Sequence, residues 1–468
     1  MSKADVDLVI VGAGPAGMAA AAQAAGHGVS VFLLDEQLAG GGQIYRDVDS
    51  TTEKRAAILG KDYRRGQDLV RALSHENIEH VRGASVWQVD RHCKVAYTVN
   101  GQGRRISARR LLLASGALER PMPIAGWTLP GVMTAGAAQI LLKQSGLVGQ
   151  QAVLAGSGPL LYLLAAQMIR AGQRPLALVE TQSRHDMLAA AKHLWGALRG
   201  WPYLVKGLSM LREINAAKVP RYVGATDLAC LGQGKVQGIS FRQGGQTHRL
   251  NTSLVLLHHG VVPNIQASQS LRLDHAWDDA QQCFKPVTDR WGATGAEGVF
   301  VAGDGAGIGG ATVAELSGRL AALKISAELN FIDAKGCDQL ASPLRSQLQR
   351  ELSARPFIDR AYPPYVQAMQ PDDATIICRC EEVTAGQVRQ YATLGCLGPN
   401  QTKAFGRVGM GPCQGRYCGL TVSQILAKEN SQTLDETGYY RIRPPLKPIT
   451  IGELATVESE QDELSPLE

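Results

Sequence analysis

Short apolar runs recur along the first 330 residues of the chain, separated by glycine-rich turns and by stretches with helical spacing. The first run covers residues 6–11, leads into an alanine-rich segment at residues 18–25, and is followed by a second run at residues 29–34. Runs of this length are typical of strands buried on both faces of a parallel sheet, and the segment between them predicts the connecting helix. The pattern predicts an α/β fold built from strand–helix–strand units.

A second unit of the same kind is predicted in the middle of the chain. Residues 152–169 form an uncharged run that is nearly long enough to span a membrane. Gly156, Gly158 and Pro159 interrupt it, so we interpret it as strand, turn and helix, and we predict no transmembrane helix. A further strand is predicted at residues 176–179.

The turn after the first strand carries Gly12-Ala-Gly14-Pro-Ala-Gly17. The first glycine permits a tight turn, the second lets the backbone approach a pyrophosphate, and the third lets helix and strand pack closely. The phosphates would lie at the helix N-terminus, where free N–H groups and the helix dipole attract anions. The second strand ends in Asp35-Glu36, where an acid accepts hydrogen bonds from a ribose. This order of elements predicts a dinucleotide site.

Three further motifs are Gly40-Gly-Gly42-Gln43-Ile-Tyr-Arg46, the strand and turn at residues 111–116, and Gly298 to Asp304. With them the chain resembles the two-dinucleotide-binding flavoproteins, the fold of thioredoxin and glutathione reductases. The resemblance implies FAD at the first loop. It implies as flavin-binding residues Gly12, Gly14, Pro15, Ala16, Gly17, Asp35, Glu36, Gly42, Gln43, Ala114, Ser115, Gly116, Gly303 and Asp304. The chain lacks the redox cysteine pair of the dithiol members, which excludes disulfide reduction.

The second loop, Gly156-Ser-Gly158-Pro159-Leu-Leu161, departs from the family pattern. Leu161 replaces the third glycine, and Pro159 removes one N–H group from the loop. Glu180 ends the next predicted strand, where it could hold a ribose but would repel a 2′-phosphate. The sequence leaves two readings open, a weak NAD site and a purely structural domain.

Four cysteines near the end of the chain form the pattern Cys378-x-Cys380 and Cys413-x4-Cys418. Four soft thiolates can hold an iron–sulfur cluster or a structural zinc ion, and chance spacing of buried cysteines is a third reading. We favour a [2Fe–2S] cluster because the rest of the chain is built for redox chemistry. Residues 375–430 resemble the bacterioferritin-associated-ferredoxin module, which holds such a cluster on four cysteines.

Composition and charge narrow the function further. The net charge of +6 is small for 468 residues and its basic residues are dispersed, so we predict no nucleic-acid partner. The five other cysteines imply no disulfide framework and the N-terminus has no signal-peptide layout, which predicts a cytoplasmic protein. The adjacent His258 and His259 would point to opposite faces of a strand, and we assign no catalytic residue.

Taken over nearly its whole length, the chain resembles the large (alpha) subunit of heteromeric bacterial flavin amine dehydrogenases. These include octopine and nopaline oxidases, proline and hydroxyproline dehydrogenases, and hydrogen cyanide synthase. The resemblance implies a beta subunit related to D-amino acid oxidase that oxidises the amine, a small ferredoxin-like third subunit in some complexes, and a quinone or other electron acceptor. This chain would pass electrons through its cluster and FAD, with peripheral attachment to the inner membrane through the complex left open. The rival readings are a self-contained NAD(P)H-dependent ferredoxin-type reductase and a zinc-bound scaffold.

The fold class that we predict is α/β, with two Rossmann-like dinucleotide-binding domains and a small helical C-terminal iron–sulfur domain. The predicted division is 1–145 and 266–330 for the two parts of the FAD domain, 146–265 for the NAD-type domain, 331–374 for linker helices, 375–430 for the cluster domain and 431–468 for an extended tail. The last dozen residues are acidic and are predicted to be disordered.

Overall fold

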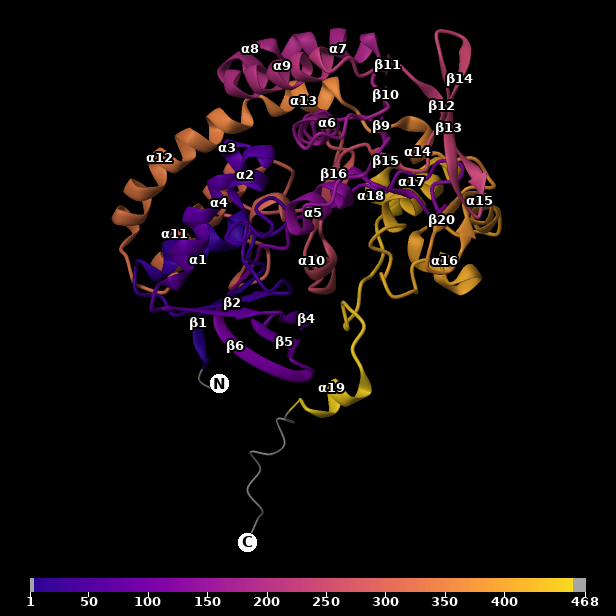
Figure 1. Ribbon diagram of the computed structural model, residues 1–468. Helices are drawn as coiled ribbons and strands as arrows, with labels where there is room; N and C mark the ends of the chain where they lie inside the picture. The colour runs from indigo at the N-terminus through magenta and orange to yellow at the C-terminus, as the bar shows by residue number, and fades with distance from the viewer. Residues whose placement is uncertain (1–3, 458–468) are drawn as a thin grey trace.

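The computed structural model describes residues 4–457, so the predicted disordered end lies almost wholly outside the described residues. Two open sheets with helices on their faces lie one above the other in Figure 1, with a helical module beside them. The predicted fold class is therefore confirmed.

The first sheet has the strand order β3-β2-β1-β6-β5-β4, with β19 also pairing with β6. Its strands β1, β2, β3 and β19 pair in parallel, as the unbroken apolar runs predict. The small alanine side chains of α1 let this helix pack closely on the sheet beside α11. The elements of this unit are β1 Val6–Val11, α1 Pro15–Ala25, β2 Val31–Asp35, α2 Glu53–Leu59, α3 Lys61–Arg64, α4 Gly66–Arg71, β3 Ile78–Arg82, β4 Ser85–Val89, β5 Lys94–Val99, β6 Gln102–Leu113, α10 Gln266–Ser270, β17 His275–Asp278, β18 Cys283–Pro286, β19 Val299–Val301 and α11 Ala311–Glu328.

The second sheet has the order β11-β10-β9-β15-β8 and is joined to the first by the crossover strands β7 and β16. Strand β8 precedes residue 146 and pairs with β15, so this sheet takes in residues ahead of the predicted boundary. The elements are β7 Ala117–Glu119, β8 Val132–Thr134, α5 Ala135–Ser145, β9 Val153–Gly156, α6 Pro159–Arg170, β10 Ala177–Glu180, α7 Arg184–Ala190, α8 Leu194–Arg199, α9 Trp201–Ala216, β11 Arg221–Val223, β12 Thr226–Gln233, β13 Lys235–Gln243, β14 Gln246–Asn251, β15 Val255–His258 and β16 Val261–Pro263.

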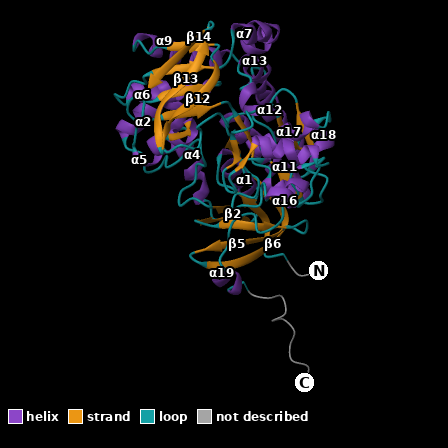
Figure 2. Ribbon diagram, turned by 90° about the vertical axis from the view of Figure 1, so that its right-hand side faces the viewer, coloured by secondary structure: helices purple, strands orange, loops and turns teal. Residues whose placement is uncertain are grey.

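The C-terminal third is mostly helical, as Figure 2 shows by colour. Helices α12 to α14 fill the predicted linker, and the cysteines lie in a module of two short strands and three helices. The elements are α12 Ala334–Leu352, α13 Arg355–Ala361, α14 Val366–Met369, β20 Ile376–Cys378, β21 Val383–Thr384, α15 Ala385–Thr393, α16 Pro399–Gly406, α17 Gly419–Glu429, α18 Leu434–Thr437 and α19 Ile451–Ala455.

The tail after the module returns to the first sheet. The N–H of Leu446 donates to the carbonyl of Trp87 over 2.7 Å, and the N–H of Gly103 donates to Thr456 Oγ1 over 2.7 Å. The short helices α18 and α19 interrupt the extended conformation expected there. The tail therefore joins the cysteine module to the first sheet.

Candidate flavin and cluster sites

The first glycine loop is pressed against two other segments. A Cβ on Gly17 would lie 1.8 Å from the carbonyl oxygen of Gly12, and a Cβ on Gly12 would lie 2.5 Å from the carbonyl oxygen of Ala114. A Cβ on Gly42 would lie 2.8 Å from the Cα of Gly14. Each of these close backbone approaches requires glycine. Three motifs that are far apart in sequence thus meet at the N-terminus of α1.

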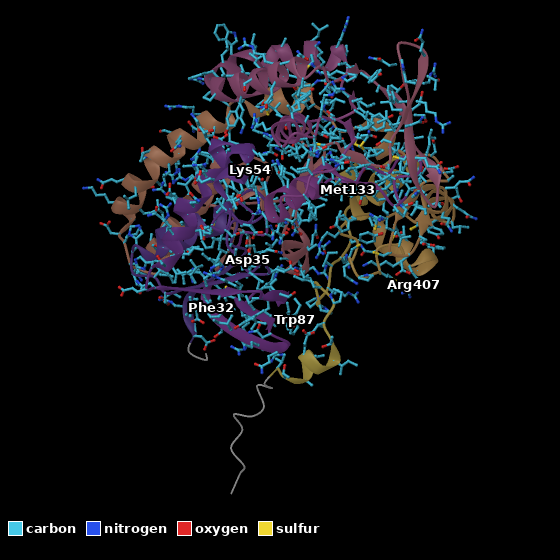
Figure 3. All side chains as sticks on the ribbon, in the orientation of Figure 1. Phe32, Asp35, Lys54, Trp87, Met133 and Arg407 are labelled. Carbon is cyan, nitrogen blue, oxygen red and sulfur yellow. The ribbon has the colours of Figure 1, made fainter. Side chains whose placement is uncertain are left out.

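The two acids after β2 have different surroundings. Asp35, labelled in Figure 3, accepts hydrogen bonds from the N–H groups of Ala13 (2.6 Å) and Gln37 (2.7 Å). Burial raises the pKa of this carboxyl group. Glu36 is exposed and forms an ion pair with Lys447 of the tail. Asp35 is therefore the acid that lies against the loop, and Glu36 faces the tail.

Gly303 and Asp304 of the late motif lie beside the first glycine loop. We call the loop, Asp35 and these two residues the flavin cradle. Gly303 has φ +73°, and a Cβ there would lie 2.7 Å from that of Ala16. One carboxylate oxygen of Asp304 accepts hydrogen bonds from the N–H groups of Gly309 and Gly310, both 2.9 Å, just before α11. Its other oxygen has no hydrogen-bond partner among residues 4–457, which suits a ligand hydroxyl.

The crossover residues are tied to each other at the same place. Ser115 Oγ donates to the carbonyl of Asn264 over 2.8 Å, and the Asn264 N–H donates to the carbonyl of Gly116 over 2.9 Å. A Cβ on Gly305 would lie 3.1 Å from Ser115 Oγ. The crossover therefore lies directly beside the late motif.

Two buried cations at this surface are absent from the predicted set. Arg46 is 6% exposed, and its Nε is enclosed without an acceptor. Lys143 Nζ donates to the Gln43 carbonyl (2.8 Å) and to Gln139 Oε1 (2.9 Å). Burial, with Arg46 nearby, lowers the pKa of Lys143 to about 7. Within the described chain neither side chain has a carboxylate ion-pair partner, so the pair fits an anionic ligand such as a dinucleotide.

Glu180, the acid expected to hold a ribose in the second unit, is instead committed to protein partners. Its carboxylate is 1% exposed and accepts from Arg221 Nε (2.6 Å) and Nη2 (2.9 Å). It also accepts from Tyr162 OH (2.5 Å) and from Gln182 Nε2 (2.6 Å). Four donors occupy its two oxygens, which leaves little capacity for ribose hydroxyls.

The linker helices cover the same edge of the second sheet. The Tyr362 ring lies edge-on to Tyr162, with centroids 6.0 Å apart. Arg360 on α13 forms an ion pair with Asp186 on α7 at 3.2 Å. These contacts place the linker beside Glu180, whose carboxylate bonds Tyr162.

The adjacent histidines are both buried and both bonded. His258 Nδ1 lies 2.7 Å from Glu119 Oε1, and its ring lies 3.1 Å from where a Cβ on Gly158 would be. His259 Nε2 bonds the Pro121 carbonyl at 2.7 Å, and its Nδ1 accepts from the Tyr365 N–H. Burial holds the pKa of His259 well below its usual range. His259 is thus a neutral structural group, while His258 fills space beside the second loop.

The four cysteine thiols gather in one place: Cys418 interacts with Cys378, Cys380 and Cys413, and Cys380 interacts with Cys413 and Cys378. Within residues 4–457, no three His, Cys, Asp or Glu side chains converge on one metal position. The Cys418 thiol, together with the N–H groups of Gly409, Glu381 and Cys380, lowers the pKa of Cys378 to about 6. Backbone N–H groups that point at the Cys378 sulfur fit a metal–sulfur ligand.

Glycines around Cys413 and Cys418 make room for two tyrosines of the tail. A Cβ on Gly409 would lie 2.6 Å from the Tyr440 ring, and one on Gly415 would lie 2.5 Å from it. A Cβ on Gly419 would lie 2.4 Å from the Tyr439 hydroxyl. Tyr440 is fully buried. The tail is thus part of the core of the cysteine module.

The loop between Cys413 and Cys418 also lies against the crossover. A narrow cavity has Leu118 and Pro263 of the crossover strands on one side and Arg416 and Tyr417 of the loop on the other. Gln266 Nε2 donates to the Gln414 carbonyl at 3.5 Å. The Cys413–Cys418 loop therefore contacts the crossover segments that follow Gly116 and precede Asn264 in sequence.

The fold and these sites define a flavoprotein of the two-dinucleotide-binding class. The family described as "Pyridine nucleotide-disulphide oxidoreductase" matches residues 6–318, and "Sarcosine oxidase A3 domain" matches residues 373–457. The A subunit of opine oxidase from Rhizobium meliloti (strain 1021) is 42% identical over 453 residues, covering 96% of this chain and 98% of that protein. The HcnB subunit of hydrogen cyanide synthase from Pseudomonas aeruginosa is 31% identical over 480 residues, covering 97% and 99%.

The crystal structure of L-proline dehydrogenase from P. horikoshii has the same fold, with a TM-score of 0.70 at 19% identity, covering 96% of this chain and 79% of that one. The chain belongs to the pyridine nucleotide-disulphide oxidoreductase family and, within it, to the large subunits of heteromeric flavin amine dehydrogenases that include the A subunit of opine oxidase. It is thus an oxidoreductase subunit, as predicted, and the family and fold support FAD. No helix among the described residues is long and apolar enough to cross a membrane.

Proposed function

We propose that this chain is the FAD- and [2Fe–2S]-containing electron-transfer subunit of a heteromeric dehydrogenase for a secondary amine or amino acid of the opine, proline or hydroxyproline class. The observation that carries the proposal is the arrangement of the four thiols. They gather in a module whose Cys413–Cys418 loop contacts the crossover beside the flavin residues. Four thiols can hold either a [2Fe–2S] cluster or a zinc ion, and the cluster is favoured because the module is joined to a flavoprotein fold.

The four thiols would then hold the two irons between them. The N–H groups of Gly409 and Glu381 at the Cys378 sulfur would stabilise negative charge there and so help set the reduction potential. A flavin exchanges one or two electrons and a cluster exchanges one, which is the chemistry that the two groups supply. The residues of this chain bind and orient those groups, and none of them acts as acid or base on the amine.

The amine would be oxidised on a partner subunit. We propose a beta subunit of the D-amino acid oxidase type as that partner, with a small ferredoxin-like subunit in some complexes. The electrons would pass to a quinone or another acceptor. The names of the relatives, which are subunits of opine oxidase and hydrogen cyanide synthase, support a multi-subunit enzyme.

The rival function, an NAD(P)H-dependent reductase, needs a working second loop. The engagement of Glu180 by Arg221, Tyr162 and Gln182 counts against it, as do the linker contacts over the same edge. We propose that the second unit is structural.

The deciding experiment is an absorption spectrum with iron and acid-labile sulfide assays on the anaerobically purified chain, alone and with its partner subunits. The proposal requires one flavin, two irons and two sulfides per chain, with bleaching by an opine, proline or hydroxyproline only when the partner is present. Zinc without sulfide would refute the electron-relay role. Bleaching of the isolated chain by NADH would establish the reductase instead.

A further inference from the structure

Helices α8 and α9 carry a row of apolar side chains on their outer face. Leu194, Leu198, Trp201, Val205 and Leu208 follow one another at intervals of three or four residues and are 46–60% exposed. This spacing places them along one side of the helical path. Trp195, beside the row, is 83% exposed. We call the five residues and Trp195 the outer apolar row.

The core of the protein does not account for this row. The opposite side of the same helices is separately apolar, with Ala197, Met210 and Ile214 buried. That inner side packs on α6 and α13. The helices are therefore held by one face while a second apolar face meets solvent, and a contiguous exposed patch of this kind marks an interaction site.

The segment that carries the row is basic. From Met187 through Arg212 there are four Lys or Arg residues and no Asp or Glu. Lys192 and Arg199 are exposed, with no ion-pair partner in the described chain. Lys206 alone of the four reaches an acid, Asp62 at 2.5 Å. The surface thus presents exposed tryptophan and leucine beside uncompensated positive charge.

The position of the row separates it from the electron-transfer module. In Figure 1, α7, α8 and α9 form the top edge of the molecule, while α15, α16 and α17 lie at its right-hand side. Figure 2 also shows α9 at the top and α16 well below it. The outer apolar row therefore lies on a different side of the molecule from the cysteine module.

We propose that the outer apolar row binds the surface of a bilayer rich in anionic lipids. The helices would lie in the plane of the membrane with the tryptophans at the headgroup level and Lys192 and Arg199 on lipid phosphates. Amphipathic helices with Trp and Leu on one face and Lys and Arg beside it bind membranes in this way. Protein interfaces share the tryptophan and arginine of this surface but are depleted in lysine, so the exposed Lys192 favours the lipid surface. The inference goes beyond the proposed function and does not depend on it.

The test is co-sedimentation of the full chain, and of its complex, with two kinds of vesicle. One kind is phosphatidylcholine alone, and the other contains phosphatidylglycerol. We expect binding to the second kind, weakened by salt and accompanied by a blue shift of tryptophan fluorescence. The double variant Lys192→Gln/Arg199→Gln should bind roughly 30-fold more weakly, from about fivefold per basic residue near an anionic surface. Trp195→Ser/Trp201→Ser should abolish binding.

Matched controls come from α12, which carries exposed residues away from the row. Lys335→Gln and Leu340→Ser should leave vesicle binding unchanged. Flavin and iron contents measured on every variant report folding and separate this test from that of the proposed function. Failure to bind phosphatidylglycerol vesicles overturns the proposal. Loss of self-association or of partner co-purification in the tryptophan variant also overturns it and assigns the row to a protein.

Discussion

Replacing Arg221 by methionine would test whether the second dinucleotide unit is structural. Glu180 is 1% exposed and Arg221 is 25% exposed, with two N–O distances of 2.6 and 2.9 Å between them. Arg221→Met keeps the length of the side chain but leaves a buried carboxylate with only neutral donors. Removing one partner of a buried pair costs about 3–5 kcal/mol, and the partial exposure of Arg221 favours the lower end. At roughly 2–4 °C per kcal/mol for a unit of this size, we expect the melting temperature to fall by about 6–12 °C.

The assay is differential scanning calorimetry of the flavin-loaded chain, with the double variant Glu180→Gln/Arg221→Met as the matched control. The double variant removes the buried charge together with its partner and should recover most of the lost stability. An NADH titration of each variant, followed by flavin absorbance, completes the test. An unchanged melting temperature for Arg221→Met, with NADH now reducing the flavin, would show that Glu180 is a ribose ligand and that our reasoning is wrong.

Three further predictions concern the two candidate cofactor sites. Gly17→Ala should abolish flavin retention because its Cβ would lie 1.8 Å from a backbone oxygen, whereas Gly207→Ala, with open space around it, should keep the flavin-to-protein ratio. Stoichiometric flavin in Gly17→Ala would contradict the assignment of this loop as the flavin site. Cys378→Ser should lose iron and sulfide but keep flavin, and Cys396→Ser, a buried cysteine outside the group of four, should keep all three by elemental analysis. Burial lowers the pKa of Lys143 to about 7 in the folded chain, against 10.5 for an ordinary lysine. The unfolded chain therefore binds more protons between pH 7 and pH 10.5, and the flavin-free protein should gain about 5 kcal/mol of stability as the pH rises through that window. Lys143→Met should flatten the dependence of melting temperature on pH, and an unaltered slope would refute the lowered pKa of Lys143.

The first cradle could be predicted from the sequence because its chemistry is local. Gly12, Gly14 and Gly17 fall within one turn, and each has a steric role that no other residue type fills. The apolar runs on either side predict the strands that hold the loop, and residues 6–11 form β1 as expected. Local steric requirements of this kind can be recognised in the amino-acid sequence alone.

The fate of Glu180 could not be predicted because its partners are distant in sequence. Arg221 lies 41 residues further on, and the cover from Tyr362 comes from the linker. Lys143 likewise reaches the flavin surface from α5, about a hundred residues after the loop that it contacts. A carboxylate at the end of a strand can bind a ligand or form a buried ion pair, and the local sequence does not distinguish the two.

The tail joins the cysteine module to the first sheet. Tyr440 packs against the glycines around Cys413 and Cys418, and the next few residues lead the chain back to Trp87 on the first sheet. The segment that completes the core of the cysteine module is therefore the segment that ties that module to the flavin unit. Electron transfer between two cofactors needs a short and fixed separation, and a separate module on a flexible linker would not keep one. Because the cysteine loop also contacts the crossover strands, the module is attached to the flavin unit at two independent points, as the proposed electron relay would require.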